Sequence, residues 1–441
     1  MTPELTKLKN KIAQKKFLLG IIGLGYVGLP LSLTFLRKDI PVLGFDLDTK
    51  KIDMLHTGIS YIKHISSEKL AGFVRQGRLS ATADFSRLDE PDVLLICVPT
   101  PLTQNREPDM QFIEKTAHSI AKVLRPGQMV ILESSTYPGT TVELLLPILK
   151  NSGLSAEKDF ALAYSPERED PGNPKYSTAD IPKVVGGINE ESTKLATDFY
   201  KTGLQTVVEV SSTQTAEMSK LLENIFRSVN IALVNELKIL CHRMGIDVWE
   251  VIRASSTKPF GYMPFYPGPG LGGHCIPIDP FYLTSKAREY DFPTKFIELA
   301  GEVNTAMPYY VVQRVMEALN RRKKSINGSR ILLLGMAYKK DVDDPRESPS
   351  FKLLELLQEK GAEVHYNDPH IPVLPQMRKY SFNLKSIDLT PATLASMDCI
   401  LLATDHSAYD YQFILDHADL IVDTRNAFNG LRGAEHKVMQ A

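Results

Sequence analysis

The chain has 441 residues, enough for roughly two to four domains of ordinary size. Hydrophobic residues make up 43% and charged residues 23%, a globular composition that excludes a disordered or fibrous protein. Lys and Arg total 51 against 52 Asp and Glu, so the chain lacks the positive excess of a dedicated nucleic-acid-binding protein. The 4 cysteines form no Cys-x-x-Cys pair, which argues against zinc ribbons and disulfide frameworks. We therefore expect a cytoplasmic enzyme with reduced thiols and no metal.

Residues 17–36 carry no charge and are long enough to cross a membrane. Glycines and Pro30 interrupt this segment, however, and its middle reads GLGYVG. That clustering suits a buried strand, a tight turn and the start of a helix better than one continuous helix. We therefore expect no membrane span here.

Short apolar runs alternate with helical stretches in the first half of the chain, a pattern typical of a parallel sheet covered on both faces. The expected strands there are 17–22, 41–46, 92–99 and 128–133. The same alternation of apolar runs and helical stretches recurs near the end of the chain, where the expected strands are 330–335, 362–368, 398–404 and 419–424. The fold class is therefore α/β, with two Rossmann-like doubly wound domains. The second series lacks a Gly-x-Gly-x-x-Gly turn, so it need not bind a dinucleotide.

Between the two series, the spacing of apolar residues predicts one long amphipathic helix over 213–244 and a further helix over 294–321. A helical middle of this kind is a natural hinge and dimer surface, so we predict a homodimer or a higher homo-oligomer. The first ten or so residues and 432–441 are expected to be tails.

A glycine turn follows the first expected strand and precedes a helix, the context that dinucleotide binding requires. It reads Gly23-Leu24-Gly25-Tyr26-Val27-Gly28. The first glycine makes the turn, the second lets the backbone approach a pyrophosphate, and the third packs helix against strand. Asp46 ends the next strand, 18 residues after Gly28, where a carboxylate can accept hydrogen bonds from both ribose hydroxyls. A 2′-phosphate would meet like charge there, so NAD is favoured over NADP. The alternative is a structural turn with Asp46 as a solvated strand end.

The densest glycine stretch is 267–279 (PGPGLGGHCIPID), which lets the backbone close around a ligand and carries one thiol. The Cys275 thiolate can add to an aldehyde, giving a thiohemiacetal that loses hydride to become a thioester. A nearby cation would lower the pKa of this thiol. The alternative is a small buried cysteine in a structural loop, and the loop alone does not decide between the two.

Further polar residues cluster at helical and loop positions. Glu217, Lys220 and Asn224 share one face of the long helix, for which the plainer reading is a solvated surface. The segment 165–170 (SPERED) could supply a water-activating carboxylate, or it could be a charged surface loop. Lys339 and Lys340, with Arg346, could bind phosphate, or they could form a solubilising turn.

Seven motifs follow one another along the chain: GLGYVGLPLS (23–32), VPTPL (98–102), ESSTYPG (133–139), SPER (165–168), the Lys220/Asn224 helix, GGHCIPID (272–279) and GMAYKKDVDDPRESP (335–349). In this order they resemble the UDP-glucose/GDP-mannose dehydrogenase family, over about residues 16–430. The resemblance implies four-electron oxidation of a nucleotide sugar's C6 alcohol to a carboxylate, with two NAD per turnover.

Roles for individual residues come from the resemblance. Cys275 would be the nucleophile, Lys220 would stabilise oxyanions and favour the thiolate, and Asn224 would donate a hydrogen bond beside it. Asp279 would assist proton transfer with a water near Thr136, and Glu167 would act in thioester hydrolysis.

The resemblance also implies the residues that bind cofactor and substrate. Asp46 and Lys51 would hold the adenosine ribose. The remaining contacts would be Thr100 and Thr136 at NAD, and Gly272, Lys339 and Arg425 with Glu167, Lys220 and Asn224 at the sugar nucleotide.

The resemblance divides the chain into three domains. These are an NAD-binding Rossmann domain over 1–211, a central helical and dimerisation domain with the Cys275 loop over 212–325, and a UDP-sugar-binding Rossmann-like domain over 326–441. The implied partner is a UDP-sugar, with neither nucleic acid nor membrane.

Substrate choice depends on branch-specific residues. Ile278 and Pro171 stand where UDP-glucose members usually carry a lysine and a second carboxylate, and Lys258 is the nearest candidate for a cross-subunit arginine. The segment 258–283 instead resembles the UDP-N-acetylglucosamine 6-dehydrogenase branch, which implies formation of UDP-N-acetylglucosaminuronate for polysaccharide precursors. UDP-N-acetylmannosamine and UDP-glucose are the alternative substrates.

Two readings from other classes stay open. A two-electron dehydrogenase of the 6-phosphogluconate type would share the folds but would not need Cys275. An inactive nucleotide-sugar sensor would keep the glycine loops and lose Cys275, Lys220 or Asp279, all of which are present.

Overall fold

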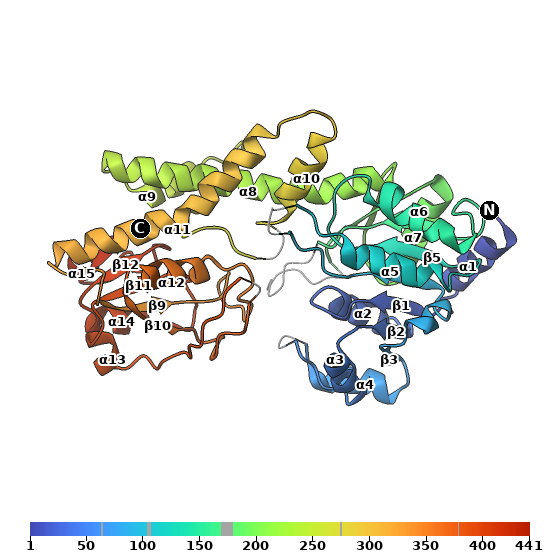
Figure 1. Ribbon diagram of the computed structural model, residues 1–441, viewed down its shortest axis with the longest axis horizontal. Coiled ribbons are helices and arrows are strands. Elements are labelled where there is room, and N and C mark those ends of the chain that lie inside the picture. Colours follow the sequence, from blue (N-terminus) through green and yellow to red (C-terminus); the bar gives the residue numbers. More distant parts are fainter. Residues whose placement is uncertain (63–64, 104–106, 169–179, 274–275, 378) are drawn as a thin grey trace. The chain divides into compact units, whose positions relative to one another are not determined.

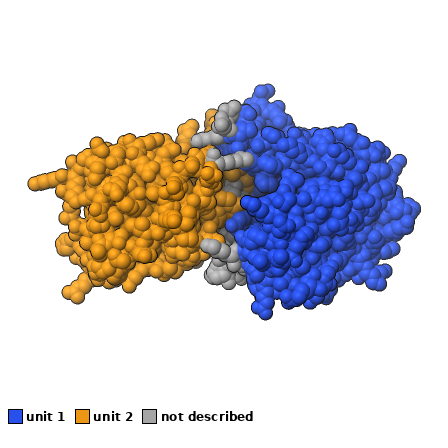
Figure 2. Space-filling view, turned by 60° about the horizontal axis from the view of Figure 1, so that its bottom comes forward, with its two compact units in different colours: residues 1–223, 281–292 blue, residues 224–280, 293–441 orange. Residues whose placement is uncertain are grey.

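The computed structural model describes residues 1–441 except 63–64, 104–106, 169–179, 274–275 and 378. The chain forms two compact units, which are coloured separately in Figure 2. Unit 1 comprises residues 1–223 and 281–292, and unit 2 comprises residues 224–280 and 293–441.

Unit 1 contains a sheet with the strand order β3-β2-β1-β4-β5-β6-β7-β8. Figure 1 labels its strands β1, β2, β3 and β5. All neighbouring strands are parallel except β6 and β7. The strands are β1 (Leu19–Ile22), β2 (Val42–Phe45), β3 (Leu79–Thr82), β4 (Val93–Ile96), β5 (Met129–Leu132), β6 (Ala161–Tyr164), β7 (Lys183–Gly187) and β8 (Val207–Glu209). The reversal of strand order at β1 confirms the predicted doubly wound fold.

The helices of unit 1 correct one expectation and confirm another. The helices that lie wholly in unit 1 are α1 (Pro3–Ala13), α2 (Gly28–Leu36), α3 (Thr49–His56), α4 (Ser67–Arg75), α5 (Gln111–Ala121), α6 (Leu146–Leu149) and α7 (Glu190–Lys201). The expected N-terminal tail is wrong, because α1 buries Leu5, Leu8 and Ile12 on one face. The uncharged segment 17–36 forms β1, the glycine turn and α2. No helix among the described residues is long and apolar enough to cross a membrane.

Unit 2 contains an all-parallel sheet with the order β10-β9-β11-β12-β13. Its strands are β9 (Arg330–Leu334), β10 (Glu363–Asn367), β11 (Cys399–Leu402), β12 (Ile421–Asp423) and β13 (Val438–Gln440). The first four confirm the predicted second series. The expected C-terminal tail is wrong, because β13 pairs with β12 and Ala441 is buried.

Helices of the middle and C-terminal regions complete the fold. They are α8 (Thr213–Met244), α9 (Val248–Ser255), α10 (Asp279–Arg288), α11 (Lys295–Arg321), α12 (Pro349–Glu359), α13 (Pro391–Ala395), α14 (Tyr411–His417) and α15 (Ala434–Lys437). Helices α11 and α12 pack on each other, and the core of unit 2 includes side chains of both together with those of β9, β10, β11 and β12.

Helix α8 has the predicted bounds, and it buries Leu221, Val234 and Cys241, but most of its large apolar side chains are exposed. The exposed apolar stripe of α8 consists of Met218, Leu222, Phe226, Leu233, Leu237, Leu240 and Met244. Its buried polar side chains are Glu217, Lys220, Asn224, Ser228, Asn235 and Lys238. The reading of Glu217, Lys220 and Asn224 as a solvated face is therefore wrong.

Candidate active site

The glycine turn after β1 has the geometry that each glycine's predicted role requires. Gly23 has a φ of +92°, and a Cβ there would lie 2.6 Å from the carbonyl oxygen of Cys97. A Cβ on Gly28 would lie 2.0 Å from the carbonyl oxygen of Gly23, so helix α2 packs directly on the turn. A Cβ on Gly25 would meet no described atom within 4 Å, which leaves room for a pyrophosphate at that position.

Asp46 follows β2 and faces this turn. Its Oδ2 accepts a hydrogen bond from the backbone N–H of Leu24 at 2.9 Å and lies 3.3 Å from Nζ of Lys51. Its side chain is 11% exposed, so the carboxylate can still accept from a ribose hydroxyl. The plainer reading of Asp46 as a solvated strand end is wrong. The residues therefore fit NAD.

Tyr61 belongs to the same corner and was not predicted from the sequence. Its hydroxyl donates to the carbonyl oxygen of Leu24, and its ring lies beneath Lys51. Burial, followed by the charges of Asp46 and Asp48, raises the pKa of Tyr61, so the phenol stays a donor. No local pattern around Tyr61 indicated this contact.

The remaining candidates of unit 1 follow the carboxyl ends of neighbouring parallel strands. Thr100 follows β4, Thr136 follows β5 and Glu167 follows β6. The Thr100 carbonyl accepts a hydrogen bond from the Tyr282 hydroxyl at 2.7 Å. The buried Thr136 hydroxyl shares a hydrogen bond with that of Thr140.

Lys220 reaches Glu167 from helix α8. Its ammonium donates to the main-chain oxygen of Glu167 and lies 3.5 Å from Oε2 of the same residue. Lys220 is 4% exposed and Glu167 is 9% exposed, so this pair is largely desolvated. In such surroundings a positive charge acts on a nearby oxyanion more strongly than it would in water.

The carboxylate of Glu217, one turn earlier on α8, is engaged in hydrogen bonds that stabilise the local structure. It accepts hydrogen bonds from the backbone N–H groups of Gly139 and Thr141, at 2.6 and 2.9 Å, and from the Thr141 hydroxyl. Burial raises its pKa to about 7 despite these donors. Glu217 thereby fixes the turn that follows Thr136.

In unit 2, Asn224 and Asp279 form a second buried pair. Asn224 donates to Oδ2 of Asp279, which is the first residue of α10 and is 1% exposed. Arg227 donates to the amide oxygen of Asn224, so the amide can only present its nitrogen to Asp279. Arg227 was not singled out in the sequence, although it lies three residues from Asn224 on the same helix.

The glycine-rich segment 268–273 packs against the carboxyl edge of the second sheet. The N–H of Gly268 donates to Asn235 at 3.0 Å, and a Cβ there would lie 2.5 Å from a guanidinium nitrogen of Arg425. A Cβ on Gly272 would lie 2.7 Å from Cβ of Tyr338, and the N–H of Gly273 donates to the Arg346 carbonyl at 3.3 Å. Only glycine allows this approach. His274 and Cys275 lie outside the described residues, so the nucleophile assignment stays a prediction.

The loops after β9 and β12 bring the last candidates to this edge. Gly335 has a φ of +88°, and the half-buried Lys339 follows it on the same loop. The half-buried Arg425 donates from Nε to the Ala403 carbonyl at 2.8 Å. Arg346 forms a bidentate pair with Asp344, from Nε to Oδ1 at 2.9 Å and from Nη2 to Oδ2 at 2.6 Å, which occupies part of its guanidinium.

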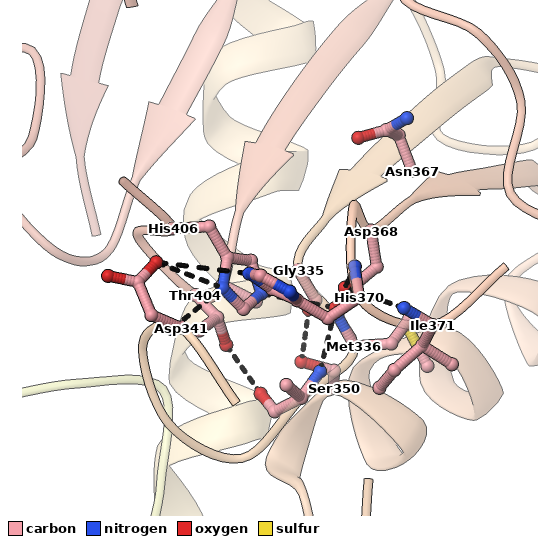
Figure 3. Close-up of polar contacts among 12 residues, drawn as sticks. Gly335, Met336, Asp341, Ser350, Asn367, Asp368, His370, Ile371, Thr404 and His406 are labelled. Atoms are coloured by element: carbon pink, nitrogen blue, oxygen red, sulfur yellow. Dashed lines mark hydrogen bonds and ion pairs between the residues drawn. The ribbon is translucent and has the colours of Figure 1, made fainter. Parts of the chain in front are cut away.

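An aspartate also follows the second strand of the C-terminal sheet, and Figure 3 shows its surroundings. Asp368 follows β10 as Asp46 follows β2, and it accepts the N–H groups of Met336 and Ala337 at 2.7 and 2.9 Å. Its side chain is fully buried, however, and its Oδ2 also pairs with His406 at 3.2 Å. A ribose cannot use this carboxylate, which agrees with the absence of a glycine fingerprint.

The predicted residues thus divide between the two units. Unit 1 holds the glycine turn, Asp46, Lys51, Thr100, Thr136, Glu167 and Lys220. Unit 2 holds Asn224, Gly272, Asp279, Lys339 and Arg425. Helix α8 carries Lys220 and Asn224 one turn apart.

Comparison with known proteins assigns a family description to each of three segments. Residues 17–204 match the NAD binding domain of the UDP-glucose/GDP-mannose dehydrogenase family, residues 214–306 its central domain, and residues 332–430 its UDP binding domain.

Similar whole proteins carry different substrate names. A UDP-N-acetyl-D-glucosamine 6-dehydrogenase of Pseudomonas aeruginosa is 36% identical, over 90% of this chain and 92% of its own. An NDP-N-acetyl-D-galactosaminuronic acid dehydrogenase of Ralstonia nicotianae is 33% identical, over 94% and 97%. The solved structure of a UDP-D-ManNAc dehydrogenase from Pyrococcus horikoshii superposes with a TM-score of 0.85 at 31% identity, over 96% and 98%.

Proposed function

Because the chain belongs to the UDP-glucose/GDP-mannose dehydrogenase family, we propose that it oxidises the C6 alcohol of UDP-N-acetylglucosamine to the carboxylate of UDP-N-acetylglucosaminuronate. It is an NAD-dependent UDP-sugar dehydrogenase with a UDP-binding domain. The observation that carries the proposed chemistry is the pair of desolvated contacts on α8, Lys220 with Glu167 and Asn224 with Asp279.

The reaction converts one alcohol and one water into a carboxylate, with removal of four electrons. When bound, NAD accepts the hydride of each oxidation. The Cys275 thiolate adds to the intermediate aldehyde, forming a carbon–sulfur bond and an oxyanion that Lys220 stabilises. Loss of the second hydride leaves a thioester. Glu167 takes a proton from the water that attacks this thioester, and cleavage of the carbon–sulfur bond releases the carboxylate and the Cys275 thiolate. Asp279 moves the proton of the alcohol, and its bond from Asn224 holds it in one orientation.

The choice of sugar rests on the segment 258–283 rather than on overall identity. Relatives named for three different N-acetylated sugars are 31–36% identical to this chain. These identities are too similar to select one sugar as the substrate. A site for an acetamido group offers polar partners and room for a methyl, and a sugar with a plain hydroxyl leaves both unfilled. UDP-N-acetylmannosamine and UDP-glucose are therefore the competitors to test.

Helix α8 supports the proposal of a homodimer. Its exposed apolar stripe runs from Met218 to Met244, and Leu222 and Met244 are each 61% exposed. Contiguous apolar surface of this kind marks an interaction site in a globular protein. We place the reaction in the cytoplasm because Cys275 must stay reduced to act as a nucleophile.

The test is an NADH-absorbance assay with UDP-N-acetylglucosamine, UDP-N-acetylmannosamine, UDP-glucose, GDP-mannose and 6-phosphogluconate at equal concentrations. We expect the highest kcat/KM with UDP-N-acetylglucosamine. A higher value with UDP-glucose would refute the branch assignment, and turnover of 6-phosphogluconate alone would refute the reaction class.

A further inference from the structure

Two loops of unit 2 lie where its strand order reverses. The β9 loop (residues 335–344) follows β9, and the β11 loop (residues 403–407) follows β11, which pairs with β9 on the side away from β10. In doubly wound sheets, ligands bind in the crevice outside the strand ends at this reversal. The conformation of the two loops therefore determines which groups a nucleotide meets.

His406 joins the two loops (Figure 3). Its ring is fully buried, and its Nδ1 lies 3.0 Å from the backbone nitrogen of Asp341. A backbone N–H can only donate, so Nδ1 is the acceptor and Nε2 carries the proton. Nε2 then donates to Oδ2 of Asp368 at 3.2 Å. Burial alone would raise the pKa of Asp368, but the bonds from His406, Ala337 and His370 outweigh burial and lower it.

Asp341, whose N–H donates to Nδ1 of His406, is held in place by further contacts. It has a φ of +58°, in the left-handed region, which aspartate visits more readily than most residues but seldom without support. Its two carboxylate oxygens accept from the N–H and the hydroxyl of Ser407, each at 2.7 Å. The Thr404 hydroxyl donates to the Ala337 carbonyl at 2.7 Å, so the loops are joined at both ends.

Lys339 lies between these two attachment points. It is two residues from Asp341 and two from Ala337, so both bonds restrict the movement of its backbone. Asp368 is closed to a ribose by its own bonds, so a nucleotide at this edge depends on loop groups instead.

We propose that His406 is a positioning residue, which holds the β9 loop through the N–H of Asp341 so that Lys339 can bind the diphosphate of a UDP-sugar. The inference rests on the proposed function, because it takes the ligand of this edge to be UDP. His406 does not contact the ligand itself.

A metal site is the competing interpretation of the same residues. Oδ1 of Asp341 lies 3.8 Å from Nδ1 of His406 and 3.9 Å from Nε2 of His370, and these residue types bind zinc. The lone pair of Nδ1 is already used by the Asp341 N–H, however, and Nε2 carries a proton. The hydrogen-bonded link accounts for both ring nitrogens, whereas a metal would need one of them released.

Two substitutions separate the two bonds of His406. In His406→Asn the amide oxygen takes the place of Nδ1 and can still accept from Asp341, but the side chain cannot reach Asp368. In His406→Gln the amide nitrogen takes the place of Nε2 and can donate to Asp368, but nothing accepts from Asp341. His436→Gln is the matched control, because that side chain is 83% exposed in the same unit.

The measurements on the full chain are the Kd of UDP by calorimetry, the KM and kcat with the UDP-sugar, and hydrogen exchange in the β9 loop. We expect His406→Gln to raise the Kd of UDP and the KM of the UDP-sugar at least tenfold and to speed exchange in the loop. Its kcat and its KM for NAD should stay within twofold. His406→Asn should stay within threefold in every constant, and His436→Gln should match the wild type.

Three results would overturn the proposal. They are unchanged UDP affinity in His406→Gln, an equal loss in both His406 variants, and a stoichiometric Zn²⁺ site that both variants lose. If His406→Gln does not fold, Ser407→Ala removes one bond to Asp341 at an exposed position and should raise the Kd of UDP severalfold. Wild-type protein that binds no UDP would instead refute the proposed function, and this inference with it.

Discussion

Two substitutions in the glycine turn, Gly25→Ala and Gly28→Ala, should distinguish an effect on cofactor binding from an effect on folding. Gly25 lies outside the left-handed region, and a Cβ there meets no described atom within 4 Å. Gly25→Ala should therefore leave the free energy of unfolding unchanged or raise it by up to about 1 kcal/mol, since alanine restricts the unfolded chain. A Cβ at Gly28 would lie 2.0 Å from the Gly23 carbonyl oxygen, so helix α2 must shift. Gly28→Ala should lower the free energy of unfolding by about 1–3 kcal/mol or more.

NAD binding should be weakened by the substitution that leaves the fold intact, Gly25→Ala. In Gly25→Ala the added methyl group occupies the space through which the backbone approaches the pyrophosphate. It therefore weakens the charge-assisted hydrogen bonds between backbone N–H groups and the pyrophosphate, which are worth about 1.5–3 kcal/mol. That range corresponds to a rise of roughly ten- to a hundredfold in the KM for NAD.

The assay combines urea unfolding of both variants with initial rates at varied NAD and saturating UDP-sugar. Gly25→Ala should unfold at the wild-type urea concentration and show the raised KM. A Gly25→Ala enzyme with wild-type KM for NAD would refute the assignment of this turn to the pyrophosphate. A Gly28→Ala enzyme of wild-type stability would refute the packing argument.

Three further predictions concern charge, pH and assembly. Asp46→Ala should narrow the preference for NAD over NADP by at least tenfold in kcat/KM, because it removes repulsion of a 2′-phosphate, and an unchanged ratio would exclude that role. Glu217 binds its proton more tightly in the folded state, so stability should fall as the pH rises from 4.5 to about 7, by at most about 3 kcal/mol. Urea titrations at pH 5 and pH 8 should show a smaller fall in Glu217→Gln, and equal falls would contradict the assigned pKa. Leu237→Asp should lower the sedimentation-derived mass toward that of the monomer, whereas a monomeric wild type would refute the dimer.

The strands and the long helices could be predicted from the sequence because their signals are local. A continuous apolar run bounded by turn residues places β1 or β9 within a few residues, and α8 has the bounds that its periodicity predicted. The N-terminal helix has a local signal too, since Leu5, Leu8 and Ile12 follow helical spacing, so the expectation of a tail there overlooked that periodicity.

The faces of α8 could not be predicted, because periodicity shows that two faces differ but not which one is buried. Lys220 and Asn224 are buried because Glu167 and Asp279, more than 50 residues away in the chain, supply their partners. The link from His406 to Asp341 spans 65 residues, and no local pattern contains it.

The central claim is a four-electron oxidation through a thioester on Cys275, and the yield of NADH per sugar tests it most directly. With limiting UDP-N-acetylglucosamine and excess NAD, the wild type should form two NADH and one carboxylate for each sugar consumed. Cys275→Ser, which keeps a hydroxyl of similar size but poorer nucleophilicity, should lose the second oxidation by about a thousandfold, on the order of 4 kcal/mol, and still bind NAD. Two NADH per sugar from Cys275→Ser at the wild-type rate, or one from the wild type, would contradict the account.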